Sequence, residues 1–295
     1  METPLRALKG LIWTMRPHQW TKNILFVFPA IVFDAKLLQF NLLLRVIVAC
    51  ILLILISGTV YIINDLLDIE SDKQHPKKRF RPIPSGELPL GFAKAAAVII
   101  PTVTLIIAFL FDTSLAFILI TYLVLQIAYS VRLKHIALLD VLSVAFGFVL
   151  RTIAGGVVIN VVISPWLYAF TGLLALFLIV AKRRQELVKL GEDAKITRPI
   201  FQQYNLPLLD DMLRMVTTST LMTYILYTIE VQTMTINGIN FGLTTVPFVL
   251  YGLFRYLYLI HVEEVSDAPD EVLLRDRPMQ ATVLLAGVAF VIILY

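Results

Sequence analysis

Cysteine is almost absent from this sequence, since Cys50 is the one example among 295 residues. A single cysteine excludes a disulfide framework within the chain and a metal site built from several cysteines. Charged residues are also scarce, at 16% of the chain, whereas soluble domains carry about a quarter. With a hydrophobic content of 58% and a mean hydropathy of +0.82, this excludes an ordinary soluble domain and indicates a polytopic membrane protein.

No cleavable signal peptide is evident at the amino terminus, because Met1–Thr21 carries three cations without a continuous apolar core. The same stretch has apolar residues near one helical face, with cations and tryptophans around them. This pattern predicts an interfacial amino-terminal segment over residues 1–21, with the apolar face made by Leu5, Leu8, Ile12 and Met15.

Long apolar runs predict about nine membrane spans, because a helix needs roughly 20 apolar residues to cross the hydrocarbon core. The expected spans are 22–36, 43–64, 92–111, 115–131, 138–160, 165–181, 212–232, 244–262 and 279–295. We therefore expect an all-α helical bundle that forms a single integral membrane catalytic domain over residues 1–295. No nucleic-acid partner is expected, and an oligomer is left open.

Lys and Arg gather on one side of this predicted topology. The segments around 65–91, 132–137, 182–211 and 263–278 share the side of the amino terminus, whereas the opposite loops hold only Lys36, with Arg45 close to a helix start. By the positive-inside rule, the charged segments are expected to face the cytoplasm.

An acidic stretch stands where the second predicted span meets water. If the helix entering from Cys50 continues through Asp72, its period places Asn64, Asp68 and Asp72 along one stripe, with Asp65 at the edge. Three carboxylates on one face repel one another unless a cation joins them. Oxygen ligands of this kind are typical of Mg²⁺, so the pattern predicts a metal site.

Cations follow the acidic stretch directly, and they would grip a phosphorylated ligand from the side opposite the metal. They are Lys73, Lys77, Lys78, Arg79 and Arg81. The pattern therefore predicts a diphosphate site. The alternative is a helix end followed by an ordinary cytoplasmic loop.

Arg151 lies within an apolar run, where a charge is expensive unless it faces a cavity or a partner. It is either a site residue or half of a structural pair with an acid on a neighbouring helix. Gly147, Gly155 and Gly156 on the same segment are interpreted as close-packing positions between helices.

The acidic stretch Asn64–Asp72, followed by Tyr129, Ser130 and Lys134, resembles the UbiA superfamily of intramembrane prenyltransferases. The resemblance implies nine transmembrane helices around a central cavity. It also implies Asp-rich motifs at the cytoplasmic ends of helices two and six that bind diphosphate through Mg²⁺. This sequence departs from the usual second motif, which is replaced by Lys182-Arg183-Arg184-Gln185-Glu186.

Five phrases are similar to one branch of that superfamily, the decaprenyl-phosphate phosphoribosyltransferases: RPHQWTKN at 16–23, HPKKRFRPIPSG at 75–86, YSVRLKH, AKRRQEL and VLLRDRP. The resemblance implies a membrane glycosyltransferase that moves 5-phosphoribose from 5-phosphoribosyl 1-diphosphate to a polyprenyl phosphate and releases diphosphate. It further implies a place in a bacterial inner membrane and a role in cell-wall biosynthesis.

On this hypothesis, each candidate site residue has an expected role. Asn64, Asp65, Asp68 and Asp72 would hold Mg²⁺, and Glu186 would bind ribose hydroxyls or neutralise nearby cations. The remaining candidates would bind the diphosphate (Lys78, Arg79, Arg81), bind the 5-phosphate or the acceptor phosphate (Lys22, Lys182, Arg183), or line the cavity (Tyr129, Lys134, Arg151).

Other functions stay open at this point. A conventional UbiA enzyme would move a prenyl group from its diphosphate to an aromatic or lipid acceptor, and it predicts a second acidic motif. A lipid transporter commonly places its substrate near the midplane on interrupted helices, whereas the polar residues here cluster at helix ends. A membrane scaffold without catalysis would tolerate loss of the acids.

Overall fold

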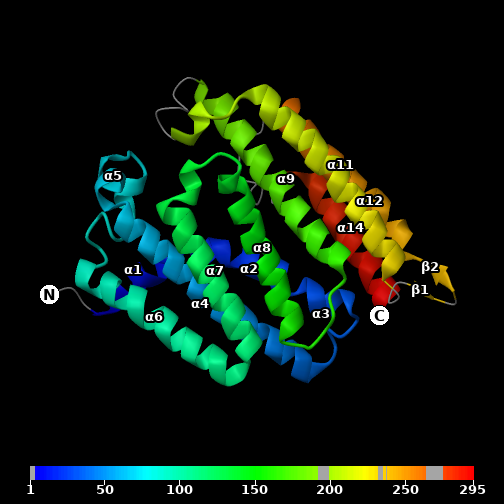
Figure 1. Cartoon of the computed structure of the whole chain (residues 1–295), viewed down its shortest axis with the longest axis horizontal. Coiled ribbons are helices and arrows are strands. Elements are labelled where there is room, and N and C mark those ends of the chain that lie inside the picture. Colours follow the sequence, from blue (N-terminus) through cyan, green and yellow to red (C-terminus); the bar gives the residue numbers. More distant parts are fainter. Residues whose placement is uncertain (1–3, 192–198, 232–234, 237, 264–274) are drawn as a thin grey trace. The chain divides into compact units, whose positions relative to one another are not determined.

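The computed structural model describes residues 4–191, 199–231, 235–236, 238–263 and 275–295 (Figure 1). The chain divides into two compact units. The first unit comprises Met1–Val32, Lys36–Ser130 and Leu150–Val161, and the second comprises Phe33–Ala35, Val131–Val149 and Val162–Tyr295. The boundary passes through α8 (Leu139–Val157), whose last eight residues belong to the first unit.

The first unit is built around two long apolar helices, α4 (Phe40–Leu67) and α6 (Leu90–Phe111), which lie side by side (Figure 1). Shorter elements flank them: α1 (Pro4–Thr14), the 3-10 turn η1 (Pro17–Gln19), α2 (Trp20–Val27), α5 (Ile69–Gln74), the 3-10 turn η2 (Lys78–Phe80) and α7 (Thr113–Val131). A further helix, α3 (Pro29–Phe33), also crosses the unit boundary.

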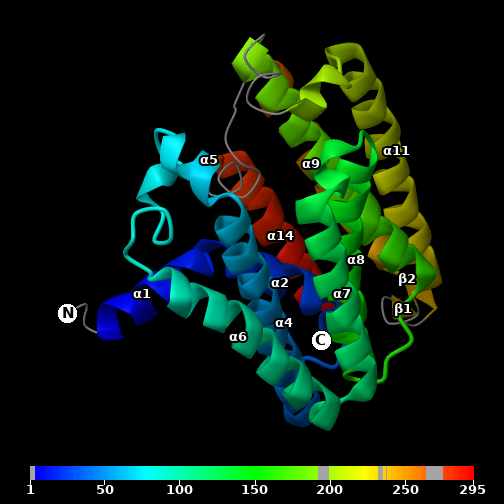
Figure 2. The same ribbon diagram turned by 60° about the vertical axis from the view of Figure 1, so that its left-hand side comes forward.

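The amino-terminal helix α1 packs against α4 and the start of α6 (Figure 2). Its Leu11 and Met15 are buried with Ile62 and Leu88 in one apolar cluster. Leu8 and Ile12 of the predicted interfacial face are exposed on the protein surface. Leu11 and Met15, which lie four residues apart, contact the bundle just before η1. The interfacial position of this segment stays a prediction.

The second unit contains α9 (Pro165–Leu190) and α11 (Leu206–Glu230) side by side, followed by α12 (Val246–His261) and α14 (Arg277–Leu294), which contact each other (Figure 1). Its remaining elements are a small antiparallel hairpin and three 3-10 turns: β1 (Thr235–Ile236), β2 (Ile239–Asn240), η3 (Leu133–His135), η5 (Pro199–Gln202) and η7 (Gly242–Thr245).

Three helices of the second unit begin in the same way. Ser164, Asn205 and Asp276 each accept a backbone N–H from the first turn, and a proline follows each cap within two residues. Such caps satisfy amide groups that have no partner inside the helix. Arg255 also donates to Asp276, and this contact holds the pKa of that carboxyl below its ordinary value.

Among the residues that the structure describes, seven helices are long and apolar enough to cross a membrane: Phe40–Leu67, Leu90–Phe111, Thr113–Val131, Leu139–Val157, Pro165–Lys189, Gly242–His261 and Arg277–Leu294. They confirm an α-helical integral membrane protein. The predicted span 22–36 is instead divided between α2 and α3, because Pro29 begins a new helix. Most of the span 212–232 falls in α11, which ends at Glu230 and is not among these seven helices. The count of nine therefore stays a prediction.

Candidate active site

The acidic stretch does not form one continuous helix. The helix α4 ends at Leu67, Asp68 takes φ −97° and ψ 12°, and α5 begins at Ile69. The prediction of a helix running unbroken through Asp72 is therefore wrong. Ser71 Oγ donates to the Asp68 carbonyl oxygen over 2.9 Å, and such local bonds compete with a regular helical ladder.

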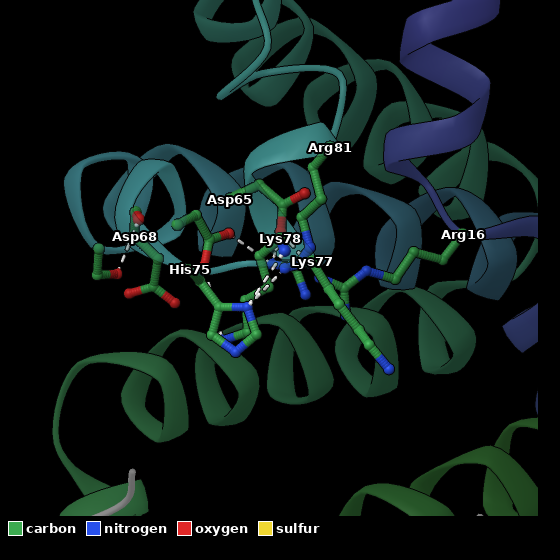
Figure 3. Close-up of polar contacts among 9 residues, drawn as sticks. Arg16, Asp65, Asp68, His75, Lys77, Lys78 and Arg81 are labelled. Atoms are coloured by element: carbon green, nitrogen blue, oxygen red, sulfur yellow. Dashed lines mark hydrogen bonds and ion pairs between the residues drawn. The ribbon is translucent and has the colours of Figure 1, made fainter. Parts of the chain in front are cut away.

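The break brings Asp65 and Asp72 onto one guanidinium group. Arg81 Nη1 lies 3.1 Å from Asp65 Oδ1 and 2.6 Å from Asp72 Oδ2 (Figure 3). Both carboxylates are buried, with 2% and 1% of their surface exposed. Lys78 Nζ lies 3.6 Å from Asp72 Oδ1. The sequence placed Arg81 opposite a metal, whereas in the structure it joins the two acids.

Arg16 is a member of this cluster that the sequence analysis missed as a site residue. Its Nη2 donates to Asp65 Oδ1 over 2.8 Å, and its guanidinium lies 4.4 Å from the ring centre of Tyr61. The backbone of Arg16 has φ 55°, just before Pro17 opens η1. In the sequence, Arg16 stands out only as part of an Arg-Pro pair at the end of an amphipathic helix. That pattern does not indicate that its partner is Asp65, 49 positions away.

Asp68 and Asn64 are placed differently from the two buried acids. Both are half-buried, and Arg81 contacts Asp65 and Asp72 but not Asp68. Figure 3 shows Arg16 and Asp68 on opposite sides of Asp65. Within the described part of the chain, no three Asp, Glu, His or Cys side chains are grouped to hold a metal ion. The structure therefore joins two of the four predicted ligands.

Two carboxylates nevertheless fit Mg²⁺, which usually takes one or two carboxylates together with waters and substrate phosphates. Asp72 Oδ1 is buried and accepts no hydrogen bond from the described residues. A buried anionic oxygen without a donor is costly, and a divalent cation would satisfy it. Asp65 and Asp72 are thus the residues that would hold the metal.

The basic loop after α5 is exposed apart from Arg81. His75 Nδ1 accepts the backbone N–H groups of Lys77 and Lys78 over 3.2 and 3.3 Å, which shapes the turn. The guanidinium of Arg79 lies 4.8 Å from the ring centre of Phe80. Lys78 and Arg81 thus contact the acidic pair, while Arg79 points elsewhere.

Arg151 lies in a second polar cluster of the first unit. Its Nε donates to Asn23 over 2.8 Å, and its Nη2 donates to the Tyr122 hydroxyl over 2.6 Å. Asn23 in turn donates to Ser57 over 3.1 Å. All four side chains are buried. Arg151 thus donates to at least two neutral groups. Lys22 and Tyr129, both half-buried, are further candidates in the same unit.

The basic second motif lies on α9 in the second unit. Arg183 is buried, and it donates from Nε to Asp140 over 3.1 Å and from Nη1 to Glu186 over 3.0 Å. Lys182 is exposed, and Lys134 is half-buried on η3. The sequence predicted Arg183 as a phosphate ligand, whereas the structure places it between two carboxylates.

Asp140 is a second residue that the sequence analysis missed. It is fully buried, and besides Arg183 it accepts the Tyr204 hydroxyl over 2.6 Å. Tyr204 also accepts the backbone N–H of Leu138 over 2.8 Å. Burial, reinforced by the hydrogen bond to Asp140, raises the pKa of Tyr204 above its ordinary value. This network orients Arg183 and, through it, Glu186.

A model of the UbiA prenyltransferase family matches residues 24–274. The decaprenyl-phosphate phosphoribosyltransferase of Corynebacterium glutamicum is 31% identical over 288 residues, which cover 96% of this chain and 86% of that protein. The protein of the same name from Mycobacterium tuberculosis is 29% identical over 287 residues, covering 96% and 93%.

Among solved structures, a UbiA homolog from Archaeoglobus fulgidus bound to DMAPP and Mg²⁺ has a TM-score of 0.65 and 16% identity, with 98% of each chain covered. The same homolog bound to Cd²⁺ has a TM-score of 0.67. These likenesses identify the fold.

Proposed function

The chain belongs to the UbiA prenyltransferase family, and from this premise we propose that it transfers 5-phosphoribose from 5-phosphoribosyl 1-diphosphate to a polyprenyl phosphate. Diphosphate is the leaving group. The observation that carries the proposal is the contrast between the two motifs: an acidic pair on α4 and α5, and a basic set around Lys182 on α9. Near-full-length similarity to proteins named decaprenyl-phosphate phosphoribosyltransferase supports it.

The contrast fits the charges of these substrates. One acidic pair suffices for one diphosphate held through a metal. The 5-phosphate of the donor and the phosphate of the acceptor need cations instead, and Arg and Lys are the usual phosphate ligands. A prenyl diphosphate donor with a neutral acceptor would leave the exposed Lys182 without a phosphate to bind, whereas Arg183 is already held by Asp140 and Glu186.

Each residue of the acidic cluster then has a task. Asp65 and Asp72 would hold Mg²⁺, with Asn64 and Asp68 as further candidate ligands, and the bound metal would stabilise negative charge on the leaving diphosphate. Lys78 and Arg81 lie against the same carboxylates and orient the diphosphate. Bond breaking at C1 leaves an oxocarbenium-like ribose.

Positioning dominates over proton transfer in this reaction. The acceptor phosphate carries an anionic oxygen at neutral pH, so it attacks C1 without a strong general base. Lys182, Lys22 and Lys134 supply cations for the remaining phosphates. Glu186, which Arg183 holds by a 3.0 Å bond, accepts ribose hydroxyls.

We propose further that both units act as a single catalytic domain in a bacterial inner membrane, with the active site facing the cytoplasm. The Lys and Arg distribution supports this orientation. The polyprenyl tail would stay among lipid-facing helices, where a long apolar chain is already soluble. A furanosyl donor for a cell-wall glycan would be the product.

The test is direct. Purified protein is incubated with Mg²⁺, 5-phosphoribosyl 1-diphosphate labelled in the ribose, and polyprenyl phosphates of several lengths. Label is expected in the organic phase, and addition of a chelator should abolish it. If a folded sample gives no labelled lipid but moves a labelled prenyl group from its diphosphate, the enzyme is a conventional UbiA prenyltransferase.

A further inference from the structure

The acidic pair of the first unit is tied to more positive charge than it carries. Asp65 and Asp72 contribute two negative charges, and both are at least 98% buried. Arg16, Arg81 and Lys78 lie within 3.6 Å of them and contribute three positive charges. The two carboxylates are therefore already compensated by cations before any metal binds.

We infer that Arg16 and Arg81 make this site bind the metal together with diphosphate and disfavour the metal alone. The inference rests on the proposed function in one respect, that the donor's leaving group is a diphosphate. It assigns Arg16, to which the sequence analysis gave no role in the site, to the donor site as a ligand of that group.

The contacts at Asp65 and Asp72 explain why the metal alone binds weakly. Asp65 Oδ1 accepts from Arg16 and Arg81 at 2.8 and 3.1 Å, and Arg81 also holds Asp72 Oδ2 at 2.6 Å. A divalent cation that takes these oxygens must displace a guanidinium. The displaced group is 26% to 30% exposed, so it stays close to the metal and repels it.

Diphosphate removes that conflict, because a displaced guanidinium gains phosphate oxygens in place of the carboxylate. Arginine is suited to this exchange, since its planar fork matches carboxylate and phosphate equally well. Arg16 is held at the site through the exchange by Tyr61, whose ring centre lies 4.4 Å from the guanidinium carbon. The left-handed backbone at Arg16 likewise fixes where its side chain starts.

An independent observation indicates where a metal would enter. Asp72 Oδ1 is buried, accepts no hydrogen bond from the described residues, and has Lys78 Nζ at 3.6 Å as its cation. This oxygen is available without breaking a hydrogen bond. For the metal to bind Asp65 as well, Arg16 or Arg81 would have to leave Asp65 Oδ1. We therefore expect Arg16 to determine whether the metal binds through Asp72 alone or through both carboxylates.

The experiment measures the two ligands separately on the full chain in detergent. Binding of Mn²⁺ alone is followed by the loss of the free-ion EPR signal. Binding of labelled inorganic diphosphate is followed by equilibrium dialysis at saturating Mn²⁺. The variants are Arg16→Gln, Arg16→Lys and, as a matched control from the same segment, Arg6→Gln, because Arg6 is exposed on α1.

Opposite shifts are expected for Arg16→Gln. Its affinity for Mn²⁺ alone should rise at least threefold, because a competing cation is gone, and its affinity for diphosphate should fall at least tenfold. Arg16→Lys keeps the charge but loses the fork, so Mn²⁺ binding should stay weak while diphosphate binding falls several-fold. Arg6→Gln should change neither affinity.

A purely structural role for Arg16 predicts a different pattern. If Arg16→Gln weakens both ligands together, or changes neither, the inference is overturned. Should Arg16→Gln fail to fold, Arg16→Lys decides, since unchanged diphosphate binding in that variant also overturns it. Opposite shifts in a protein that transfers no labelled phosphoribose would preserve this inference and reject the proposed donor.

Discussion

Burial separates the three carboxylates of the acidic stretch. Asp65 and Asp72 are buried against Arg81, whereas Asp68 is half-buried at the helix break. A buried acid contributes to folding through its partners, and a more exposed one does so much less. The two classes of acid should therefore respond differently to the same Asp-to-Asn change.

We expect Asp68→Asn to abolish Mg²⁺-dependent turnover and to leave the protein folded. Asp72→Asn should lose turnover as well, but it should also lose roughly 1–3 kcal/mol of stability, because Arg81 and Lys78 lose a charged partner. Thermal unfolding and turnover measured on the same samples check this. Normal turnover in Asp68→Asn would remove that carboxylate from the mechanism.

Lys182 is an exposed cation of the second motif, so its side chain contributes little to folding. Lys182→Ala should reduce kcat/KM at least tenfold, as expected for a lost phosphate contact of about 1.4 kcal/mol or more, with an unchanged Tm. Lys94→Ala, at an exposed position on α6, serves as the control. An unchanged kcat/KM for Lys182→Ala would argue against a cationic second motif.

At the scale of helices, Gly155 sets how closely α8 approaches α2. A Cβ at this position would overlap the backbone carbonyl oxygen of Val27, which cannot move as a side chain does. Gly155→Ala should therefore destabilise the protein by about 1–3 kcal/mol, the usual cost of overpacking. In Gly287→Ala the new Cβ meets nothing within 4 Å, so this control should be neutral or slightly stabilising. Equal Tm values for the two variants would contradict the packing interpretation.

The segment between α9 and α11 is joined to the start of α8 by Tyr204. Its hydroxyl donates to Asp140 and accepts from Leu138, so Tyr204→Phe should cost about 1–3 kcal/mol. Because the pKa of Tyr204 is raised, this contribution should be constant below pH of about 10, the ordinary tyrosine value, and should fall above it. Chemical unfolding from pH 7 to 11 measures it. Tyr251→Phe, at an exposed ring, is the control. If the difference in unfolding free energy between wild type and Tyr204→Phe stays the same from pH 7 to 11, the assignment is contradicted.

For the chain as a whole, local sequence patterns predicted those features that depend on neighbouring residues. Composition and apolar runs indicated an α-helical membrane protein, and seven of the expected spans are long apolar helices. The acidic stretch was correctly placed at the end of α4. Periodicity did not predict the break at Asp68, because it follows the spacing of side chains and does not report the departure of one residue from helical backbone angles.

Partners distant in sequence were also beyond pattern reasoning. Arg16 lies 49 positions from Asp65, and Asp140 lies 43 positions from Arg183. The sequence identifies Arg16 and Arg183 as charged residues, but tertiary packing determines which carboxylate each of them contacts. Arg183 was consequently predicted as a phosphate ligand although Asp140 and Glu186 hold it.

Ligand linkage gives a prediction for the entire molecule, because any ligand that binds only the folded chain raises its stability by mass action. At about 100 times its Kd, one ligand adds roughly 2.7 kcal/mol. If the cations around Asp65 and Asp72 oppose free metal, Mg²⁺ alone and diphosphate alone should each raise Tm slightly. The two together should raise it by clearly more than the sum.

Differential scanning fluorimetry with a two-by-two ligand design measures this. Asp72→Asn is the control variant, since it removes the buried oxygen that lacks a donor, and it should lose the joint effect while remaining folded. A full Tm increase with Mg²⁺ alone would mean that Arg16 and Arg81 yield their carboxylates freely. In that case Arg16 and Arg81 would stabilise the fold without opposing free metal. Other residues of the chain would then have to determine whether Mg²⁺ and diphosphate bind together.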